Sequence, residues 1–111
     1  MGTIHIDLFT TLDGVAQAPG GSDEDLDGGF AFGGWQAPLF DDLDGEAVGA
    51  GMAEMDALLL GRRTYDIFAA HWPHIQVDPE ASNFDAMNAD IARTFNSITK
   101  YVATHRPESL D

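Results

Sequence analysis

The chain of 111 residues contains no cysteine. Disulfides, thiolate nucleophiles and cysteine-ligated zinc sites are therefore excluded. No apolar run approaches the roughly 18 residues of a transmembrane helix, and the N-terminal stretch MGTIHIDLF is too short and too polar for the core of a secretory signal. We therefore expect a soluble protein of the cytoplasm that has no membrane partner.

Positive charge is almost as scarce, because five Lys and Arg stand against 19 Asp and Glu, and the formal net charge is −14. Nucleic acids and anionic membranes bind clustered cations, and a field of this sign repels them, so neither is an expected partner. A small phosphorylated ligand is still compatible, since a few well-placed donors suffice. The hydrophobic content of 44% is enough for the core of one domain.

The first half of the chain predicts one strand, a long loop and a helix. Residues 3–10, TIHIDLFT, alternate apolar with polar side chains and predict a strand. Residues 19–46 are dense in glycine and acids and predict a loop that packs through its aromatic residues. A helix is expected over 42–54, with one apolar face made of Leu43, Ala47, Ala50 and Met55.

The second half predicts two strands that alternate with helices. ALLLG at 57–61 is expected to be a strand buried on both faces, and KYVAT at 100–104 a further strand. Thr64 is the predicted cap of a short helix that ends near Ala70. Ser82 or Asn83 is expected to cap another helix, whose apolar stripe comprises Phe84, Met87, Ile91 and Phe95.

This order predicts an α/β fold with a mostly parallel sheet flanked by helices. The three predicted strands form a small sheet, and only one predicted helix has a clear apolar stripe to cover it. A parallel sheet needs cover on both faces. We therefore expect either that a second subunit completes it, which favours a homo-oligomer, or that the chain is the N-terminal part of a larger domain.

Three of the five cations follow the two predicted inner strands directly. In parallel sheets, ligands bind at the carboxyl ends of the strands, so we expect an anion there. A helix that begins near Thr64 would offer free N–H groups to a phosphate, and Arg106 could form two hydrogen bonds to a second one. The alternative is that these cations are solvated and only neutralise nearby acids. The two clusters are Gly61-Arg62-Arg63-Thr64 and Thr104-His105-Arg106.

Four stretches together resemble the dihydrofolate reductase-like family, and more closely its riboflavin-biosynthesis reductase branch. They cover nearly the whole chain in order: TLDGVAQAPGG, GGFAFGGW, DALLLGRRTYDIFAAHWP and FNSITKYVATHRP. The resemblance implies an NADPH-binding α/β reductase that acts on a pterin-like, uracil-like or ribosyl-type small molecule. Family members continue with further strands and a Gly-rich segment, so it also implies a domain that is incomplete at the C-terminus.

The resemblance also implies roles for individual residues. The segment Gly61-Arg62-Arg63-Thr64 would hold the cofactor's phosphates at a helix N-terminus, and Thr104-His105-Arg106 would contact the adenosine 2′-phosphate. Val15, Ala16 and Ala18 would border the nicotinamide.

The residues that would complete a reductase are less sharply indicated. Asp13, which follows the first predicted strand, and Asp41 or Asp42, before the first helix, are candidate proton donors. Phe32 and Trp35 could stack on a planar substrate, although aromatic residues in loops also serve to fix the loop on the core.

Two other classes of function stay open. Asp23, Asp25 and Asp27 have the spacing of the first ligands of a calcium loop, but Gly34 stands where the bidentate Glu should be. No zinc or hydrolase motif occurs, so we expect no metal. The third possibility is a non-catalytic reductase-like module that folds only through association.

Overall fold

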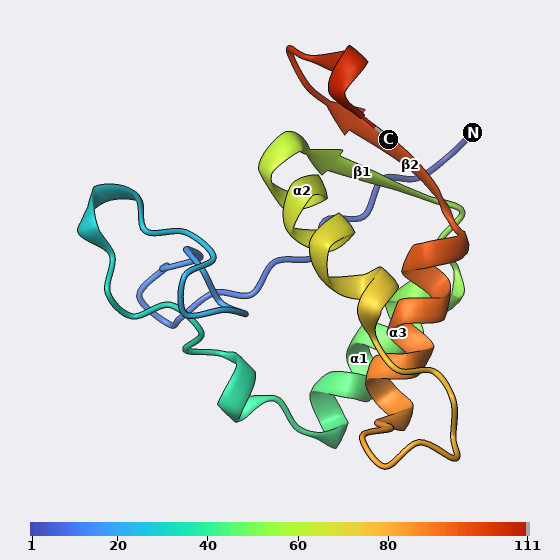
Figure 1. Cartoon of the computed structure of the whole chain (residues 1–111). Coiled ribbons are helices and arrows are strands. Elements are labelled where there is room, and N and C mark those ends of the chain that lie inside the picture. Colours follow the sequence, from blue (N-terminus) through green and yellow to red (C-terminus); the bar gives the residue numbers. More distant parts are fainter. Residues whose placement is uncertain (111) are drawn as a thin grey trace. The chain divides into compact units, whose positions relative to one another are not determined.

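The computed structural model describes residues 1–110, and its contacts divide the chain into two compact units (Figure 1). The first unit comprises residues 1–42 and the second begins at Leu43, so each is described by itself. No helix within residues 1–110 is long and apolar enough to cross a membrane.

The first unit consists of loop and two short 3-10 turns, η1 (Asp27–Gly29) and η2 (Ala37–Leu39). The strand predicted over 3–10 is wrong: residues 1–10 form neither helix nor strand in the described chain, and all are exposed. Ile4 and Ile6 are 82% and 88% exposed. Alternation of apolar and polar residues produces a strand only where a neighbouring strand accepts its hydrogen bonds, and the first unit contains no strand.

The long loop of the first unit folds around Gln17, whereas packing through its aromatic residues was predicted. The Gln17 amide Nε2 donates to the carbonyl oxygens of Asp25 and Asp27 at 3.1 and 2.9 Å. The backbone comes so close at Gly33 that a Cβ there would lie 2.4 Å from the carbonyl oxygen of Ser22. Polar contacts and a close backbone approach therefore hold this loop, with Ala18 as its one buried hydrophobic residue.

The second unit has an α/β architecture. Its two strands pair in parallel, with Ala57 opposite Thr99 and Gly61 opposite Ala103, so the predicted parallel pairing is confirmed. The expected third strand is absent from the described residues. The elements in chain order are α1 (Asp42–Ala53), β1 (Ala57–Gly61), α2 (Arg62–His71), η3 (Trp72–His74), α3 (Ala86–Ser97), β2 (Thr99–Ala103) and η4 (Pro107–Ser109).

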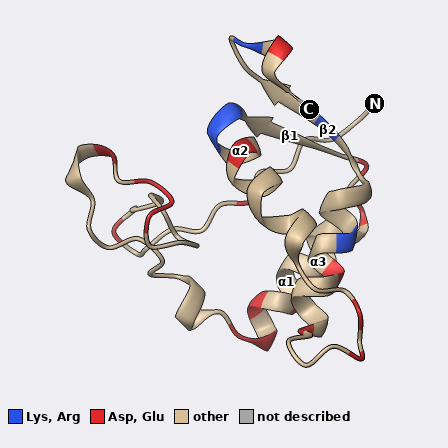
Figure 2. Cartoon of the chain, viewed as in Figure 1, with Lys and Arg blue, Asp and Glu red and all other residues tan. Residues whose placement is uncertain are grey.

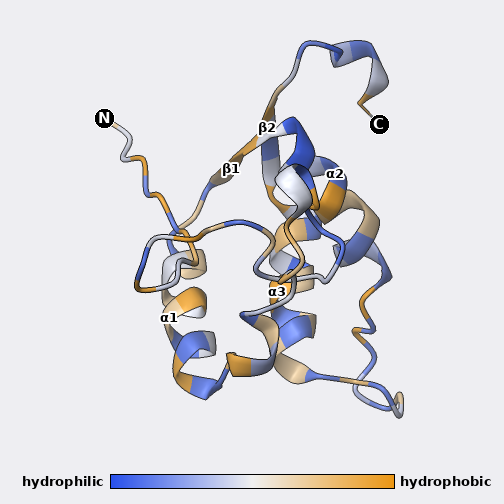
Figure 3. Ribbon diagram, turned by 90° about the vertical axis from the view of Figure 1, so that its left-hand side faces the viewer, coloured by the Kyte–Doolittle hydropathy of each residue, from blue (hydrophilic) through white to orange (hydrophobic). Residues whose placement is uncertain are grey.

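The prediction that the first inner strand is buried on both faces is wrong. Leu60 is buried, whereas Leu59 is 71% exposed and its register partner Tyr101 is 62% exposed. Helix α2 contacts both strands, and successive side chains of a strand point to opposite faces. The sheet is therefore covered on one face and open on the other, although β1 is hydrophobic along most of its length (Figure 3).

Helix α1 occurs where it was expected, but its predicted apolar face is wrong. Leu43 is 73% exposed and no residue of α1 is buried. Hydrophobic and hydrophilic residues are mixed around this helix (Figure 3), so no continuous apolar stripe is available to pack.

The predicted helix caps are also wrong. Helix α2 begins two residues before Thr64, directly after Gly61, and no side chain caps it. Helix α3 begins after Asp85, whose Oδ1 accepts the N–H of Asn88 at 3.0 Å. Aspartate is as good a cap as serine or asparagine, and it lies closer to the first helical residue than either residue predicted.

Candidate functional site

The carboxyl ends of β1 and β2 bring the two basic clusters to one edge of the sheet. Gly61 pairs with Ala103, the next residues are Arg62 and Thr104, and α2 starts at Arg62. All five cations of the chain lie in this second unit, two of them in the first turn of α2 (Figure 2). The structure therefore places the two clusters together, as the strand order predicted.

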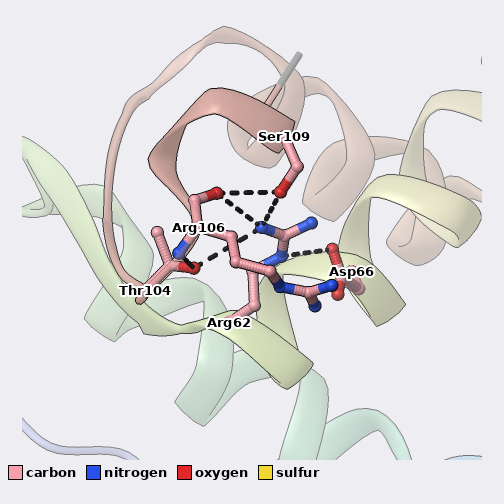
Figure 4. Close-up of polar contacts among 5 residues, drawn as sticks. All are labelled: Arg62, Asp66, Thr104, Arg106 and Ser109. Carbon is pink, nitrogen blue, oxygen red and sulfur yellow. Dashed lines mark hydrogen bonds and ion pairs between the residues drawn. The ribbon is translucent and has the colours of Figure 1, made fainter.

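Arg62 joins the start of α2 to the segment after β2 (Figure 4). Its Nε donates to Asp66 Oδ1 at 2.9 Å, an ion pair one helical turn apart. Its Nη1 donates to Ser109 Oγ at 2.6 Å, and makes longer contacts of 3.3 Å to the Arg106 carbonyl and 3.5 Å to Thr104 Oγ1. The guanidinium is thus fixed by four acceptors, and only 20% of the Arg62 side chain is exposed.

The turn that receives Arg62 is itself closed by hydrogen bonds. Thr104 Oγ1 accepts the N–H of Arg106 at 3.0 Å, and Ser109 Oγ donates to the Arg106 carbonyl at 2.8 Å. In Figure 4 the Arg106 side chain extends to the side of the turn that Arg62 occupies. Backbone and hydroxyl groups therefore close the turn on which the Arg62 guanidinium is anchored.

Donors for an anion remain at this edge. Within residues 1–110, the Arg106 guanidinium and Nη2 of Arg62 make no hydrogen bond or ion pair. No atom lies within 4 Å of the Cβ position at Gly61, so the backbone before α2 is open to a ligand. The first N–H groups of a helix have no acceptor within the helix, and its dipole favours negative charge there. These residues fit a phosphate group.

The other predicted residues of this edge are open to solvent. Arg63 and Thr64 occupy the first turn of α2, and His105 follows Thr104. All three are exposed, whereas Thr104 is half-buried.

The residues predicted to border a nicotinamide lie in the first unit. Val15 and Ala16 are half-buried, and Ala18 is buried with an unusual φ of +48°. The carbonyl of Ala18 accepts the N–H of Gly34 at 2.8 Å. Ala18 therefore contributes to the packing of its own loop, and the nicotinamide role of these residues stays a prediction.

Asp13 lies in a tight turn that Thr11 organises. Thr11 Oγ1 donates to Asp13 Oδ1 at 2.6 Å and accepts the N–H of Val15 at 2.9 Å. The Thr11 hydroxyl, followed by the backbone N–H of Asp13 itself, lowers the pKa of the Asp13 carboxyl below its ordinary value. The lowered pKa favours the carboxylate form of Asp13, and its role as a proton donor stays a prediction. Asp41, the other predicted donor, is exposed.

The two aromatic residues predicted to stack on a substrate differ in their surroundings. Trp35 is half-buried, and its Nε1 donates to the Gln17 carbonyl at 2.9 Å, so it fixes the loop. Phe32 is 74% exposed and touches Phe30 edge-on at 5.8 Å between ring centroids. Only Phe32 presents most of its ring to solvent.

The acidic loop gains no support as a cation site. No group of three acidic or histidine side chains within residues 1–110 is arranged to hold a metal ion. Asp25 Oδ1 instead accepts the N–H of Asp27 at 3.0 Å, and both carbonyls are bound to the Gln17 amide.

Two residues of the site were missed by the sequence analysis. Asp66 could have been found, because it lies four residues after Arg62 on the same helix face. Ser109 carries no such signal, since its contact with Arg62 spans 47 residues and depends on the turn after β2.

Comparison with known proteins identifies one family. The model of the RibD C-terminal domain matches residues 2–110, nearly the whole chain. No curated protein matched the chain.

Proposed function

The chain belongs to the RibD C-terminal domain family, a reductase-like, NADPH-using family of riboflavin biosynthesis, and we propose that it is itself an NADPH-dependent reductase. Its substrate is a pterin-like, uracil-like or ribosyl-type small molecule, and its fold is a dihydrofolate reductase-like sheet. One observation carries the proposal: Arg62 and Arg106 stand at adjacent carboxyl ends of one parallel sheet.

The two basic clusters, Gly61-Arg62-Arg63-Thr64 and Thr104-His105-Arg106, form what we call the basic edge of the sheet. This basic edge offers two positions for phosphate groups. The bridging phosphates would be held by Gly61, whose backbone is open, by N–H groups at the start of α2 and by Nη2 of Arg62. Thr104, His105 and Arg106 would hold the 2′-phosphate, for which the Arg106 guanidinium is available. Bound NADPH would supply the hydride.

The remaining task of the chain is to position the substrate and exclude water. Phe32 has the exposed ring that stacking on a planar substrate requires. Asp13, which lies in the turn that Thr11 organises, and the exposed Asp41 are the candidates for delivering the proton.

The test separates the two phosphate positions by comparing NADPH with NADH, which lacks the 2′-phosphate. Titrations would follow nicotinamide fluorescence of each dinucleotide with the wild-type chain. Arg106→Ala should weaken NADPH binding about tenfold and leave NADH binding unchanged, because one charge-assisted contact is lost. Arg62→Ala should weaken both. Arg93→Ala is the matched control, since Arg93 lies on α3 and pairs with Asp90 instead. Loss of binding in all three variants, or no binding by the wild type, would refute the assignment.

A second candidate is a non-catalytic reductase-like module that folds through association with another copy. It is favoured by the small core, because the buried hydrophobic residues are Ala18, Leu60, Ala89 and Ala92 in the described chain. Such a module would show unfolding that depends on protein concentration and no response to NADPH.

A further inference from the structure

A pocket of about 300 Å³ lies in the second unit, between α2, η3, α3 and the start of β2. Its walls include the rings of Tyr65, Phe68, Trp72 and Phe95, together with Lys100. Small-molecule sites are concave, largely apolar, and contain a few polar groups that fix orientation. This pocket has that composition, although its volume is at the small end of the usual range.

The aromatic wall is held in place by ring contacts. Phe68 and Phe95 stack at 5.1 Å between centroids, and Trp72 meets Phe95 edge-on at 5.2 Å. Asn96 fixes the end of this wall, since its Nδ2 donates to the Trp72 carbonyl at 3.1 Å. A planar aromatic ligand would therefore meet a preformed surface of rings.

Lys100 gives the pocket its charge. The side chain is on the covered face of the sheet and half-buried, and its Nζ donates to the Ile98 carbonyl at 3.1 Å. An ammonium has three donors, so two remain. Within residues 1–110 no carboxylate forms an ion pair with Lys100, even though the chain has 19 acids. A partly desolvated cation without an acidic partner attracts an anion from solution.

This pocket is separate from the basic edge. Lys100 is the second residue of β2, and Thr104 follows the other end of that strand. Four residues of strand span roughly 13 Å. The two regions therefore lie at opposite ends of β2.

We propose that this pocket binds a planar aromatic molecule with one carboxylate, the ring lying against Phe68, Trp72 and Phe95 and the carboxylate on Lys100 Nζ. Such a ligand matches both features at once, because its apolar part fits the ring wall and its charge satisfies the free donors. The proposal does not depend on the reductase assignment.

The test uses 2-naphthoate and its neutral counterpart 2-naphthylmethanol, with the ¹⁵N-labelled full chain. The chain has two tryptophans, so its NMR spectrum has two indole N–H signals, which Trp35→Phe and Trp72→Phe assign. Naphthoate should shift the Trp72 signal and leave that of Trp35 in place. It should also bind about five- to tenfold more tightly than naphthylmethanol, as expected for one charge-assisted contact at a half-buried site.

Lys100→Met keeps the length of the side chain and removes its charge. This variant should lose the preference for naphthoate while naphthylmethanol binds as before, and Lys100→Arg should retain the preference. Because naphthylmethanol binding also reports an intact pocket, a misfolded variant would be recognised. The proposal is overturned if naphthoate does not bind, if the Trp35 signal shifts instead, or if Lys100→Met leaves the preference unchanged.

Discussion

Replacing Arg62 by alanine should loosen the turn after β2 more than it weakens helix α2. The ion pair with Asp66 is half-exposed and has the cation on the N-terminal side, so it contributes only about 0.3 kcal/mol. A cation in the first turn of a helix opposes the dipole by a similar amount, so these two effects nearly cancel.

The hydrogen bonds from Arg62 to the turn after β2 have no such opposing effect. The 2.6 Å hydrogen bond to Ser109 is short and charge-assisted, whereas those to the Arg106 carbonyl and Thr104 are long at 3.3 and 3.5 Å. One good hydrogen bond at a partly exposed site contributes about 1 kcal/mol. This corresponds to roughly a fivefold change in the opening equilibrium of the turn.

Amide hydrogen exchange measures that opening directly. The N–H groups of Ser109 and Leu110 donate within η4, to the carbonyls of Arg106 and Pro107, at 3.2 Å each. In Arg62→Ala these two amides should exchange about fivefold faster, while those in the middle of α2 keep their wild-type rates.

Arg93→Ala is the matched control for this experiment. Arg93 also pairs with a carboxylate and donates to a carbonyl, those of Asp90 and Val77. Its removal should leave the η4 amides unchanged. Equal acceleration in the two variants, or none in Arg62→Ala, would show that the Arg62 contacts do not hold the turn.

Two further predictions concern the first unit. Gly33→Ala should lower the free energy of unfolding by about 2 kcal/mol in urea titrations, because the new Cβ would meet the Ser22 carbonyl oxygen at 2.4 Å. Gly49→Ala is the control and should be stabilising, because a Cβ at Gly49 would have no atom within 4 Å. Similar effects of the two substitutions would contradict the close approach at Gly33. Thr11→Val should raise the pKa of Asp13 toward its ordinary value, which an NMR titration of the carboxyl group measures. Because the folded-state pKa of Asp13 is lowered, the stabilisation that Asp13 contributes is present at pH values above its unfolded-state pKa near 3.8. This stabilisation is lost as the pH falls through the folded-state pKa. An unchanged Asp13 pKa in Thr11→Val would contradict the role of the Thr11 hydroxyl.

The parts of the fold that the sequence predicted are those that local pattern determines. The strands at 57–61 and 100–104 were each placed within one residue, because short apolar runs bounded by glycine or polar residues have few alternatives. The basic edge followed from their parallel pairing. The starts of α2 and α3 were missed by two or three residues; at α3 this is because Asp85 competes with Ser82 and Asn83 as a cap.

Features that depend on tertiary neighbours could not be predicted. Residues 3–10 have a strand pattern, but the first unit has no other strand with which they could pair. The burial of Leu60 but not Leu59 depends on which face α2 covers. The hydrogen bond from Arg62 to Ser109 joins residues 47 apart, so no periodicity indicates it.

The bare outer face of the sheet has a consequence for handling the protein. On this face Leu59 and Tyr101 lie opposite each other and exposed, and within residues 1–110 each strand has one edge without a paired strand. Such a surface is prone to self-association. The charge of −14 opposes such association, since like-charged copies repel one another at low ionic strength. Salt shortens the range of that repulsion to about 10 Å at 0.1 M. Colloidal behaviour should therefore change sharply with ionic strength, and also with acidification toward the isoelectric point near 4.2.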